Sequence, residues 1–317
     1  MKSLKKESDI RPLNIYKKYI SLVNNDLKNN NYYKINLTKC PICSNQKYEH
    51  FLNKKKFKYV KCKLCTSIFT INRPDANTLK MYYNKSKSNS FWYNIFWPTV
   101  VDSRVDLIFK KRASFLFKNK KSFNLNFKKY YDIGSGNNEF LKIIQKKIKK
   151  TVHGIEPSKE TNFKSKNIKV INSTFENVKL QKGSVTLFTA FELIEHVFSP
   201  YNFLKKIYKS LSFNGTLIMT FADPNGFELS TLKGKSTQFL PPLHLNFISV
   251  SGCSILLKKI GFKDIQIISM GKLDTDIVKK STNNKDNFIY KFSNYKYSQD
   301  IINRYNISSH KWLIAKK

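Results

Sequence analysis

The stretch YYDIGSGNNEFLKIIQKKIKK, residues 130–150, decides the fold. A short apolar strand runs into two glycines, Gly134 and Gly136, and an amphipathic helix follows at once. Glycines in such a turn let the backbone approach a ligand at the N-terminus of the helix. The spacing is Asp-x-Gly-x-Gly, with Asn138 where a third glycine would fall, and it differs from the Gly-x-Gly-x-x-Gly of dinucleotide sites. The segment predicts a nucleotide-like ligand between a strand and a helix.

Further along, Glu156 ends the next predicted strand, about 20 residues beyond the glycine turn. A carboxylate at this place can accept hydrogen bonds from both hydroxyls of a ribose. The alternative is an ordinary strand–helix turn followed by a solvated Glu. Together, Gly134, Gly136 and Glu156 favour a ribose-containing cofactor.

Strands and helices alternate from residue 128 onward. Predicted strands occupy 128–134, 151–157, 168–172, 184–190, 215–221, 262–270 and 311–317. Helical periodicity marks 138–150, 200–211 and 250–260, with a short helix between the second and third strands. Residues 275–306 are polar and are interpreted as an insertion or loose helix. The alternation predicts an α/β fold with a Rossmann-like, mostly parallel seven-stranded sheet and helices on both faces.

Four of the five cysteines form two C-x-x-C pairs, Cys40 with Cys43 and Cys62 with Cys65, separated by 18 residues. This spacing is typical of a tetrahedral structural zinc site, and thiolates favour zinc. Four ligands close the coordination shell, which leaves no open position for catalysis. The alternatives are four unrelated core cysteines, or a redox pair, which would need a surrounding strand–helix–strand unit.

The sequence resembles the class I S-adenosylmethionine-dependent methyltransferases over roughly residues 128–271 and the last strand. The matching segments are YDIGSGNNEF, GIEPS and SVTLFTAFELIEHVFSPYNFLKKIYKSLSFNGTLIMT. The whole chain is similar to bacterial methyltransferases with an N-terminal zinc-binding domain, often associated with surface-glycan or deoxysugar pathways. The four cysteines, the aromatic linker and the segment PPLHLNFIS fit that group.

The resemblance implies a role for eight residues around S-adenosylmethionine. Asp132, Gly134 and Gly136 would lie along its methionine portion, Glu156 would bind the ribose, Thr174 and Phe175 would approach the adenine, and Ala190 and Phe191 would lie near the sulfonium. Asn138 departs from the family pattern, where glycine is usual. Its side chain can crowd the pocket or tilt the helix, although Asn tolerates left-handed backbone better than most residues.

The segment Glu192-Leu-Ile-Glu195-His196 follows the fourth strand, and His244 follows the fifth. On a helical turn, Glu192, Glu195 and His196 would share one face. Three interpretations stay open. In the first, His196 is a general base tuned by Glu195 or His244. In the second, Glu192, Glu195, His196 and His244 hold Mg²⁺, an arrangement that resembles small-RNA 3′-end methyltransferases and some quinone-biosynthesis O-methyltransferases. In the third, the pair Glu195 and His196 only caps the strand and packs the fold.

Four segments are expected along the chain: an N-terminal helical segment (1–38), a zinc-binding ribbon (39–72), a helical, aromatic-rich linker or lid (73–127) and the methyltransferase domain (128–317). A lone amphipathic helix is expected over 10–30, a helix starting at Pro74, and another near 100–118. The aromatic cluster Phe91, Trp92, Tyr93, Phe96 and Trp97 either packs on the catalytic domain or forms a lid that excludes water over a sugar-like acceptor.

Charge is the least decisive feature. The chain has 58 Lys+Arg and 21 Asp+Glu, a formal net charge of +37. Only five of these residues are arginine, the residue that nucleic-acid readers favour, and the lysines are spread along the chain. A nucleic-acid partner is therefore not expected, whereas an anionic substrate such as a nucleotide-linked sugar is compatible. The N-terminus has no apolar signal region and no long apolar run exists, which predicts a cytoplasmic protein without a transmembrane segment.

The expected activity is transfer of a methyl group from S-adenosylmethionine to an oxygen, nitrogen or carbon atom of a small, sugar or glycan-linked acceptor, as in polysaccharide biosynthesis. The expected cofactors are S-adenosylmethionine and structural Zn²⁺. Two alternatives remain: an RNA methyltransferase that grips phosphate with its basic zinc domain, and a non-catalytic scaffold in which Asn138 has impaired cofactor binding.

Overall fold

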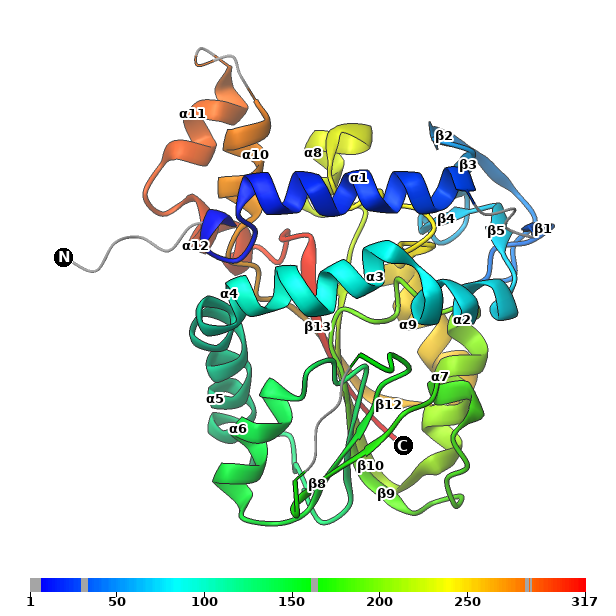
Figure 1. Cartoon of the computed structure of the whole chain (residues 1–317), viewed down its shortest axis with the longest axis vertical. Helices are drawn as coiled ribbons and strands as arrows, with labels where there is room; N and C mark the ends of the chain where they lie inside the picture. The colour runs from blue at the N-terminus through cyan, green and yellow to red at the C-terminus, as the bar shows by residue number, and fades with distance from the viewer. Residues whose placement is uncertain (1–6, 30–33, 161–164, 283–284, 286) are drawn as a thin grey trace.

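A seven-stranded sheet forms the centre of the protein (Figure 1), in the order β12-β13-β10-β9-β6-β7-β8. The computed structural model describes residues 7–29, 34–160, 165–282, 285 and 287–317. The strands are β6 (Tyr130–Ile133), β7 (Val152–Ile155), β8 (Ile168–Ile171), β9 (Val185–Ala190), β10 (Leu211–Ala222), β12 (Lys263–Ser269) and β13 (His310–Lys316). Only β13 runs antiparallel to its neighbours within this sheet. The predicted α/β fold with a mostly parallel seven-stranded sheet is confirmed.

Helices cover both faces of this sheet (Figure 1). On one face lie α5 (Lys110–Lys118) and α6 (Glu139–Ile148), and on the other α7 (Pro200–Ser210) and α9 (Val250–Ile260). Successive strand residues point to opposite faces, so Tyr130 packs in the core beneath α6 and Tyr131 in the core beneath α7. The strands are therefore buried on both sides, as their apolar sequences require.

A second sheet joins the cysteine-rich segment to the C-terminal half. Its order is β11-β4-β3-β2, with β2 at Tyr48–Lys54, β3 at Phe57–Cys62, β4 at Ile68–Thr70 and β11 at Asn246–Phe247. The strand β11 comes from the segment PPLHLNFIS, which lies almost two hundred residues further along the chain. The fully buried Arg73 fixes this junction, because its guanidinium donates to the carbonyl oxygens of Phe198 and Leu245.

The N-terminal helices cross the carboxyl ends of the parallel strands (Figure 1). They are α1 (Leu13–Asn29), α2 (Ala76–Lys85) and a helical run made of α3 (Lys87–Phe91), the π-helical η2 (Trp92–Phe96), α4 (Trp97–Arg104) and the π-helical η3 (Val105–Phe109). This run continues into α5, which lies along the face of the sheet. The Trp92 ring stacks on Phe96 with centroids 4.4 Å apart, and Tyr19 of α1 packs on Trp92 at 5.0 Å. The aromatic cluster therefore holds these helices together above the sheet.

One prediction about these helices is wrong, and another is right in type and end but not in start. Pro74 does not start a helix: it ends strand β5 (Asn72–Pro74), which pairs with β1 (Lys34–Asn36). The helix begins at Ala76 because Asp75 caps it, accepting a hydrogen bond from the Thr78 backbone at 2.7 Å. The helix expected near 100–118 begins much earlier, at Lys87.

The remaining elements lie near the C-terminus. The described part of residues 275–306 contains short helices rather than one loose helix: α10 (Asp274–Ser281), α11 (Phe288–Asn294) and α12 (Ser298–Arg304). Of these, α10 lies next to α8 (Phe227–Leu232). Short 3-10 turns are η1 (Glu7–Asp9), η4 (Phe175–Asn177) and η5 (Lys233–Lys235). The short helix predicted between the second and third strands falls partly on 161–164, outside the described residues. Within the described residues, none of the helices is both long and apolar enough to span a bilayer.

Candidate active site

A cavity of about 850 Å³ lies where the carboxyl ends of β6, β7 and β9 meet the N-terminal helices. The strand order reverses between β6 and β9, which is the place where open α/β sheets bind ligands. Seven of the eight predicted cofactor residues line the cavity: Asp132, Gly134, Gly136, Glu156, Thr174, Phe175 and Phe191. Ala190 does not line it but is 2% exposed in the core, because successive strand residues point to opposite sides.

The glycine turn has the backbone that its sequence requires. Both glycines adopt positive φ angles, 72° at Gly134 and 52° at Gly136. A Cβ added at Gly136 would meet no atom within 4 Å, so open space lies beside this backbone. The Gly136 N–H donates to Oε2 of Glu156 at 2.9 Å. The turn and the carboxylate therefore form one connected wall, and a ligand can approach the backbone closely.

Asn138 occupies its family-atypical position without blocking the cavity. It adopts a left-handed conformation, φ 66° and ψ 14°, at the start of α6, and it is fully buried. Its Oδ1 accepts a hydrogen bond from Ser135 Oγ at 2.8 Å and lies beside Gly154. The side chain is thus directed into the protein rather than into the ligand space. The expected crowding is absent, which removes the main reason for a non-catalytic scaffold.

Two buried carboxyl groups face the cavity. Oε1 of Glu156 accepts hydrogen bonds from the Ser158 backbone at 3.0 Å and from the Tyr93 hydroxyl at 3.2 Å. Oδ1 of Asp132 accepts from Thr189 Oγ1 at 2.5 Å. Burial raises the pKa of Asp132 to about 7 and also raises the pKa of Glu156. Carboxylates in such an environment gain from a ligand that donates hydrogen bonds or carries positive charge.

The end of the cavity predicted to hold the adenine is bounded by η4, which begins at Phe175 directly after Thr174. Lys206 of α7 holds this turn, because its Nζ donates to the carbonyl oxygens of Phe175, Glu176 and Val178, each at 2.7 Å. The lysine also lies over the Phe175 ring, 5.1 Å from its centroid. The shape of the predicted adenine end is therefore fixed by a residue that the sequence did not single out.

The acidic cluster does not converge as a helical turn would require. Glu192 has a φ of 51°, so the backbone leaves the helical region at its first residue. Its Oε1 instead accepts from His310 Nε2 at 2.6 Å and Thr220 Oγ1 at 2.6 Å, and lies 3.3 Å from Arg112. Although desolvation opposes the effect, His310 and Arg112 hold the pKa of Glu192 below its usual range.

Glu195 turns away from both histidines. Its carboxyl Oε1 accepts from the backbone N–H of Ala222 at 2.6 Å, and the side chain is 4% exposed. Burial, with the nearby Glu192 charge, raises the pKa of Glu195 to about 8. The Glu195 backbone carbonyl accepts from Leu245 at 2.8 Å. Glu195 thus ties two loops together and forms no hydrogen bond that would tune His196 within the described residues.

The structure does not bring the four residues named for Mg²⁺ together around a common centre. Among the residues that the structure describes, only the four cysteines form a group of three or more His, Cys, Asp or Glu side chains with ligand atoms close enough to hold a metal. The carboxylates of Glu192 and Glu195 are committed to separate partners, so they do not join His196 and His244 around a common centre.

The two histidines do meet in the cavity, with ring centroids 4.8 Å apart. His196 Nδ1 lies 3.1 Å from the Tyr83 hydroxyl. His244 Nδ1 contacts the carbonyl oxygen of Gln238, which can only accept, so Nδ1 carries the proton and Nε2 keeps a lone pair. Burial lowers the pKa of His196 to about 3 and of His244 to about 4. Both rings are neutral at physiological pH. In His244 the hydrogen bond to Gln238 places the proton on Nδ1, so Nε2 can accept a proton.

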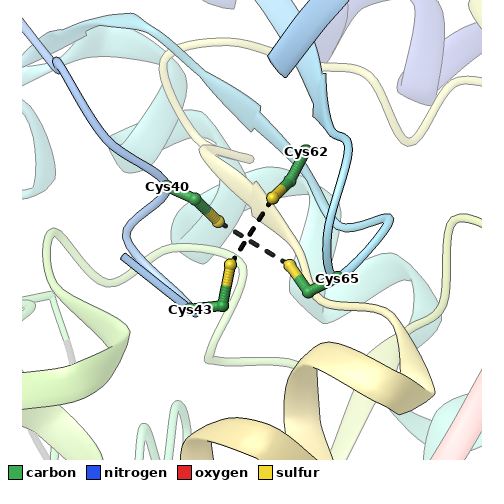
Figure 2. A group of neighbouring side chains, drawn as sticks. All are labelled: Cys40, Cys43, Cys62 and Cys65. Carbon is green, nitrogen blue, oxygen red and sulfur yellow. Dashed lines mark hydrogen bonds between the residues drawn. The ribbon is translucent and has the colours of Figure 1, made fainter. Parts of the chain in front are cut away.

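The four cysteines come together at one end of the second sheet, with their sulfur atoms directed at a common centre (Figure 2). All four Sγ atoms lie within 4.8 Å of one another, with 3.8 Å between Cys40 and Cys65 and 3.5 Å between Cys43 and Cys62. A tetrahedral zinc ion with Zn–S bonds of about 2.3 Å would separate its sulfurs by about 3.8 Å. A disulfide needs about 2.05 Å. The donor set fits a closed four-thiolate metal site.

Both C-x-x-C pairs sit in equivalent turns. The backbone N–H of Ser44 donates to the Cys40 carbonyl at 2.9 Å, and that of Thr66 donates to the Cys62 carbonyl at 3.0 Å. The residue after each second cysteine has a positive φ, 67° at Ser44 and 58° at Thr66. The repeated geometry directs each pair of thiols to the same side, as one shared ion requires.

Several residues of the site were missed by the sequence analysis. Tyr93 was placed only in the aromatic cluster, and Tyr83 and His310 were given no role in the site. Their partners lie 63, 113 and 118 residues away in the chain. Local patterns carry no signal for such contacts. The three arginines that line the cavity were counted but not placed.

Comparison with known proteins agrees with this architecture. Residues 103–267 match the family described as "Methyltransferase domain". No curated protein sequence matches the chain. Similar solved structures include a SAM-dependent methyltransferase from Archaeoglobus fulgidus, at 15% identity and a TM-score of 0.47, covering 67% of this chain and 94% of that one. Another is phosphoethanolamine N-methyltransferase 2 of Haemonchus contortus in complex with S-adenosyl-L-methionine, at 14% identity and a TM-score of 0.43, covering 60% of this chain and 48% of that one.

A third is a putative sarcosine dimethylglycine methyltransferase from Galdieria sulphuraria, at 12% identity and a TM-score of 0.47, covering 65% of this chain and 85% of that one. The family match spans more than half of the chain and begins in α4, ahead of the glycine turn. It includes Asp132, Glu156 and both ends of β9. The chain belongs to the methyltransferase-domain family and is an S-adenosylmethionine-dependent methyltransferase.

Proposed function

We propose that this methyltransferase acts on an oxygen, nitrogen or carbon atom of a small acceptor, sugar or glycan-linked, and uses His244 as its general base. S-adenosylmethionine supplies an electrophilic methyl group bound to a sulfonium. The observation that carries the proposal is that one cavity brings together the glycine turn, Glu156 and His244. The same cavity is lined by Tyr16 and Trp97, which give an acceptor a large apolar surface.

The cofactor lies along the sheet side of the cavity in this proposal. Asp132 and the two glycines would lie beside the methionine portion, where the open space at Gly136 leaves room for a ligand. Glu156 would accept the ribose hydroxyls, because its buried carboxylate is held rigidly by Gly136 and Ser158. Thr174 and Phe175 would bound the adenine, and Phe191 the reacting end.

His244 is the proposed base because its Nε2 has a lone pair and its ring is neutral. The Gln238 carbonyl holds the ring tautomer, and the Tyr59 hydroxyl donates to the His244 carbonyl at 2.7 Å, which fixes the backbone. His196 packs edge-on against His244 and bonds to Tyr83, so it acts as a positioning residue. Glu195 has the same kind of role through its contact with Ala222. An acceptor hydroxyl would give its proton to His244 as its oxygen bonds to the methyl carbon and the carbon–sulfur bond breaks, which leaves S-adenosylhomocysteine.

We also propose that the cysteine cluster binds one Zn²⁺. The ion would hold together the turn that precedes β2 and the turn that follows β3. It would thereby support β4, whose other edge pairs with β11 two residues after His244. The division of the chain at residues 39, 73 and 128 stays a prediction. The free thiols suit a reducing compartment, so a cytoplasmic location is part of the proposal.

The test is an acceptor screen that measures S-adenosylhomocysteine formation with sugars, sugar phosphates and nucleotide-linked sugars. His244→Gln should lower kcat by about 100-fold or more on the acceptor that works, since general bases contribute about 10²–10⁴-fold. His196→Gln should lower it less. Binding of S-adenosylhomocysteine with no turnover on any sugar would contradict the acceptor class but leave the cofactor assignment intact.

A further inference from the structure

Three of the five arginines of this lysine-rich chain line the cavity described above: Arg11, Arg104 and Arg112. Of the other two, Arg73 is buried between the sheets, and Arg304 is exposed in α12. The three come from separate places in the sequence, one before α1, one at the end of α4 and one in α5. The fold thus gathers its few guanidinium groups at the ligand space, while the lysines remain mostly at the surface.

Arg104 is the least compensated of the three. Its Nε and Nη2 both donate to the Ile10 carbonyl at 3.3 Å. Its guanidinium lies 5.3 Å from the ring centroid of Trp92 and 5.5 Å from that of Trp97. Within the described residues, no carboxylate forms an ion pair with it. The guanidinium lies over two indole rings in cation–π contact, and its hydrogen bonds to Ile10 use only Nε and Nη2, which leaves other N–H groups for a ligand.

The neighbouring ion pairs do not neutralise Arg104. Arg11 lies 3.7 Å from Glu7, and Arg112 lies 3.3 Å from Glu192, which also accepts from His310. In these ion pairs two carboxylates face two guanidinium groups and a histidine, and neither carboxylate pairs with Arg104; the other carboxyl groups of the cavity include Asp132 and Glu156 on the sheet side. Burial, with repulsion from Arg11 and Arg112, lowers the pKa of Arg104 to about 9. Arg104 thus carries a positive charge that the carboxylates paired with Arg11 and Arg112 do not offset, and an anionic ligand beside it would balance that charge.

The position of each arginine indicates which ligand it meets. Arg112 is the one that acts electrostatically on Asp132, and its guanidinium lies over the Phe191 ring at 4.5 Å, at the proposed cofactor end. Arg104 packs instead among the aromatic rings of the N-terminal helices, next to the carbonyl before Arg11. The pair Arg11 and Arg104 is thus placed for a second ligand rather than for the cofactor.

Building on the proposed function, we propose that the methyl acceptor carries a phosphate or carboxylate group and that Arg104, together with Arg11, binds it. A planar guanidinium matches either anion with two parallel hydrogen bonds. The aromatic rings around Arg104 would contact the uncharged part of the acceptor. The surplus of lysine is not needed for this recognition, because the specificity resides in two arginines inside the cavity.

The test measures binding of inorganic phosphate and of malonate by the fluorescence of Trp92 and Trp97, on protein saturated with S-adenosylhomocysteine. Wild-type protein should bind one of the two anions saturably. Arg104→Met should weaken that affinity by about ten-fold or more, as expected for loss of a charged hydrogen-bond pair. Arg104→Lys, which keeps the charge, should lose less, and Arg304→Met is the matched control. Circular dichroism of each variant excludes unfolding.

Two results would overturn the proposal: neither anion binds wild-type protein, or Arg104→Met binds both anions as wild type does. A third result would also overturn it: phosphate competes with S-adenosylhomocysteine, and Arg104→Met lowers the affinity for S-adenosylhomocysteine. Arg104 would then bind the carboxylate of the cofactor rather than the acceptor. The anion titration is repeated without S-adenosylhomocysteine. It therefore remains readable even if the proposed methyl transfer to a sugar is wrong.

Discussion

The Tyr93 hydroxyl donates a hydrogen bond to Oε1 of Glu156 at 3.2 Å, which connects the helical segment over the cavity to the carboxylate proposed for the cofactor ribose. Oε1 also accepts from Ser158, and Oε2 accepts from Gly136, so few lone pairs of Glu156 remain free. A ribose with two hydroxyl groups would therefore compete with Tyr93. Cofactor binding and the position of the helix that carries Tyr93 are coupled through one carboxylate.

This contact predicts the effect of Tyr93→Phe. Removing the hydroxyl frees an acceptor position on Glu156, so the affinity for S-adenosylhomocysteine should rise by about 3- to 10-fold, the net contribution of about one hydrogen bond. Isothermal titration calorimetry measures the change, and the exposed Tyr305→Phe serves as the control. Weaker binding by Tyr93→Phe would mean that the hydroxyl contacts the ligand instead of competing with it.

The cysteine cluster predicts one zinc per chain in protein purified without chelator. Cys62→Ser should lose the ion and lower the midpoint of thermal unfolding, because a structural zinc contributes folding free energy directly. Turnover should fall further than cofactor affinity, since the ribbon supports β11 beside His244 but lies away from Glu156. Cys253→Ser, in the buried face of α9, is the matched control and should keep its zinc. Zinc-free wild-type protein of normal stability would refute the metal assignment.

The buried Glu195 carboxyl group leads us to expect that Glu195→Gln stabilises the protein in a pH-dependent way. The folded-state pKa is raised to about 8, above the usual Glu value of about 4.3, so the folded protein binds the proton more tightly than the unfolded chain does. The contribution of Glu195 to the free energy of unfolding of the wild-type protein therefore falls as pH rises from about 4.3 to about 8. The free energy of unfolding of Glu195→Gln should rise relative to that of wild type across this pH range, and the difference should become constant above it.

Urea unfolding at pH 5, 6.5, 8 and 9 measures this difference, with the exposed Glu49→Gln as control. Near pH 5 the carboxylic acid and the amide have almost the same shape and charge, so the two free energies of unfolding should be close. A difference that shrinks as pH rises would show that Glu195 is ionised in the folded protein and has a partner that stabilises its charge.

The fold was predictable because its signals are local. The strand at 130–133, the glycine turn and the helix at 139–148 lie in one short segment, and each residue type suits its own backbone. The same locality explains why Cys40 to Cys65 were identified as a group. Most predicted cofactor residues also lie at strand ends, which parallel packing brings to one edge.

The catalytic cluster was less predictable because its geometry depends on distant partners. A left-handed Glu192 replaces the expected helical turn, and its carboxylate is held by His310, 118 residues further on. The tautomer of His244 depends on a backbone carbonyl rather than on a motif. Arg104 gains its meaning only from the aromatic rings and the arginines that the fold places beside it.

Calorimetric titration of S-adenosylhomocysteine into wild-type protein and Glu156→Gln tests the central claim most directly, with the exposed Glu160→Gln as control. We expect binding of one ligand per chain to wild type and to the control, and affinity at least about ten-fold weaker in Glu156→Gln, because the buried carboxylate accepts charge-assisted hydrogen bonds from the ribose. No binding to wild type, or equal affinity in Glu156→Gln, would contradict the assignment of this cavity to the cofactor.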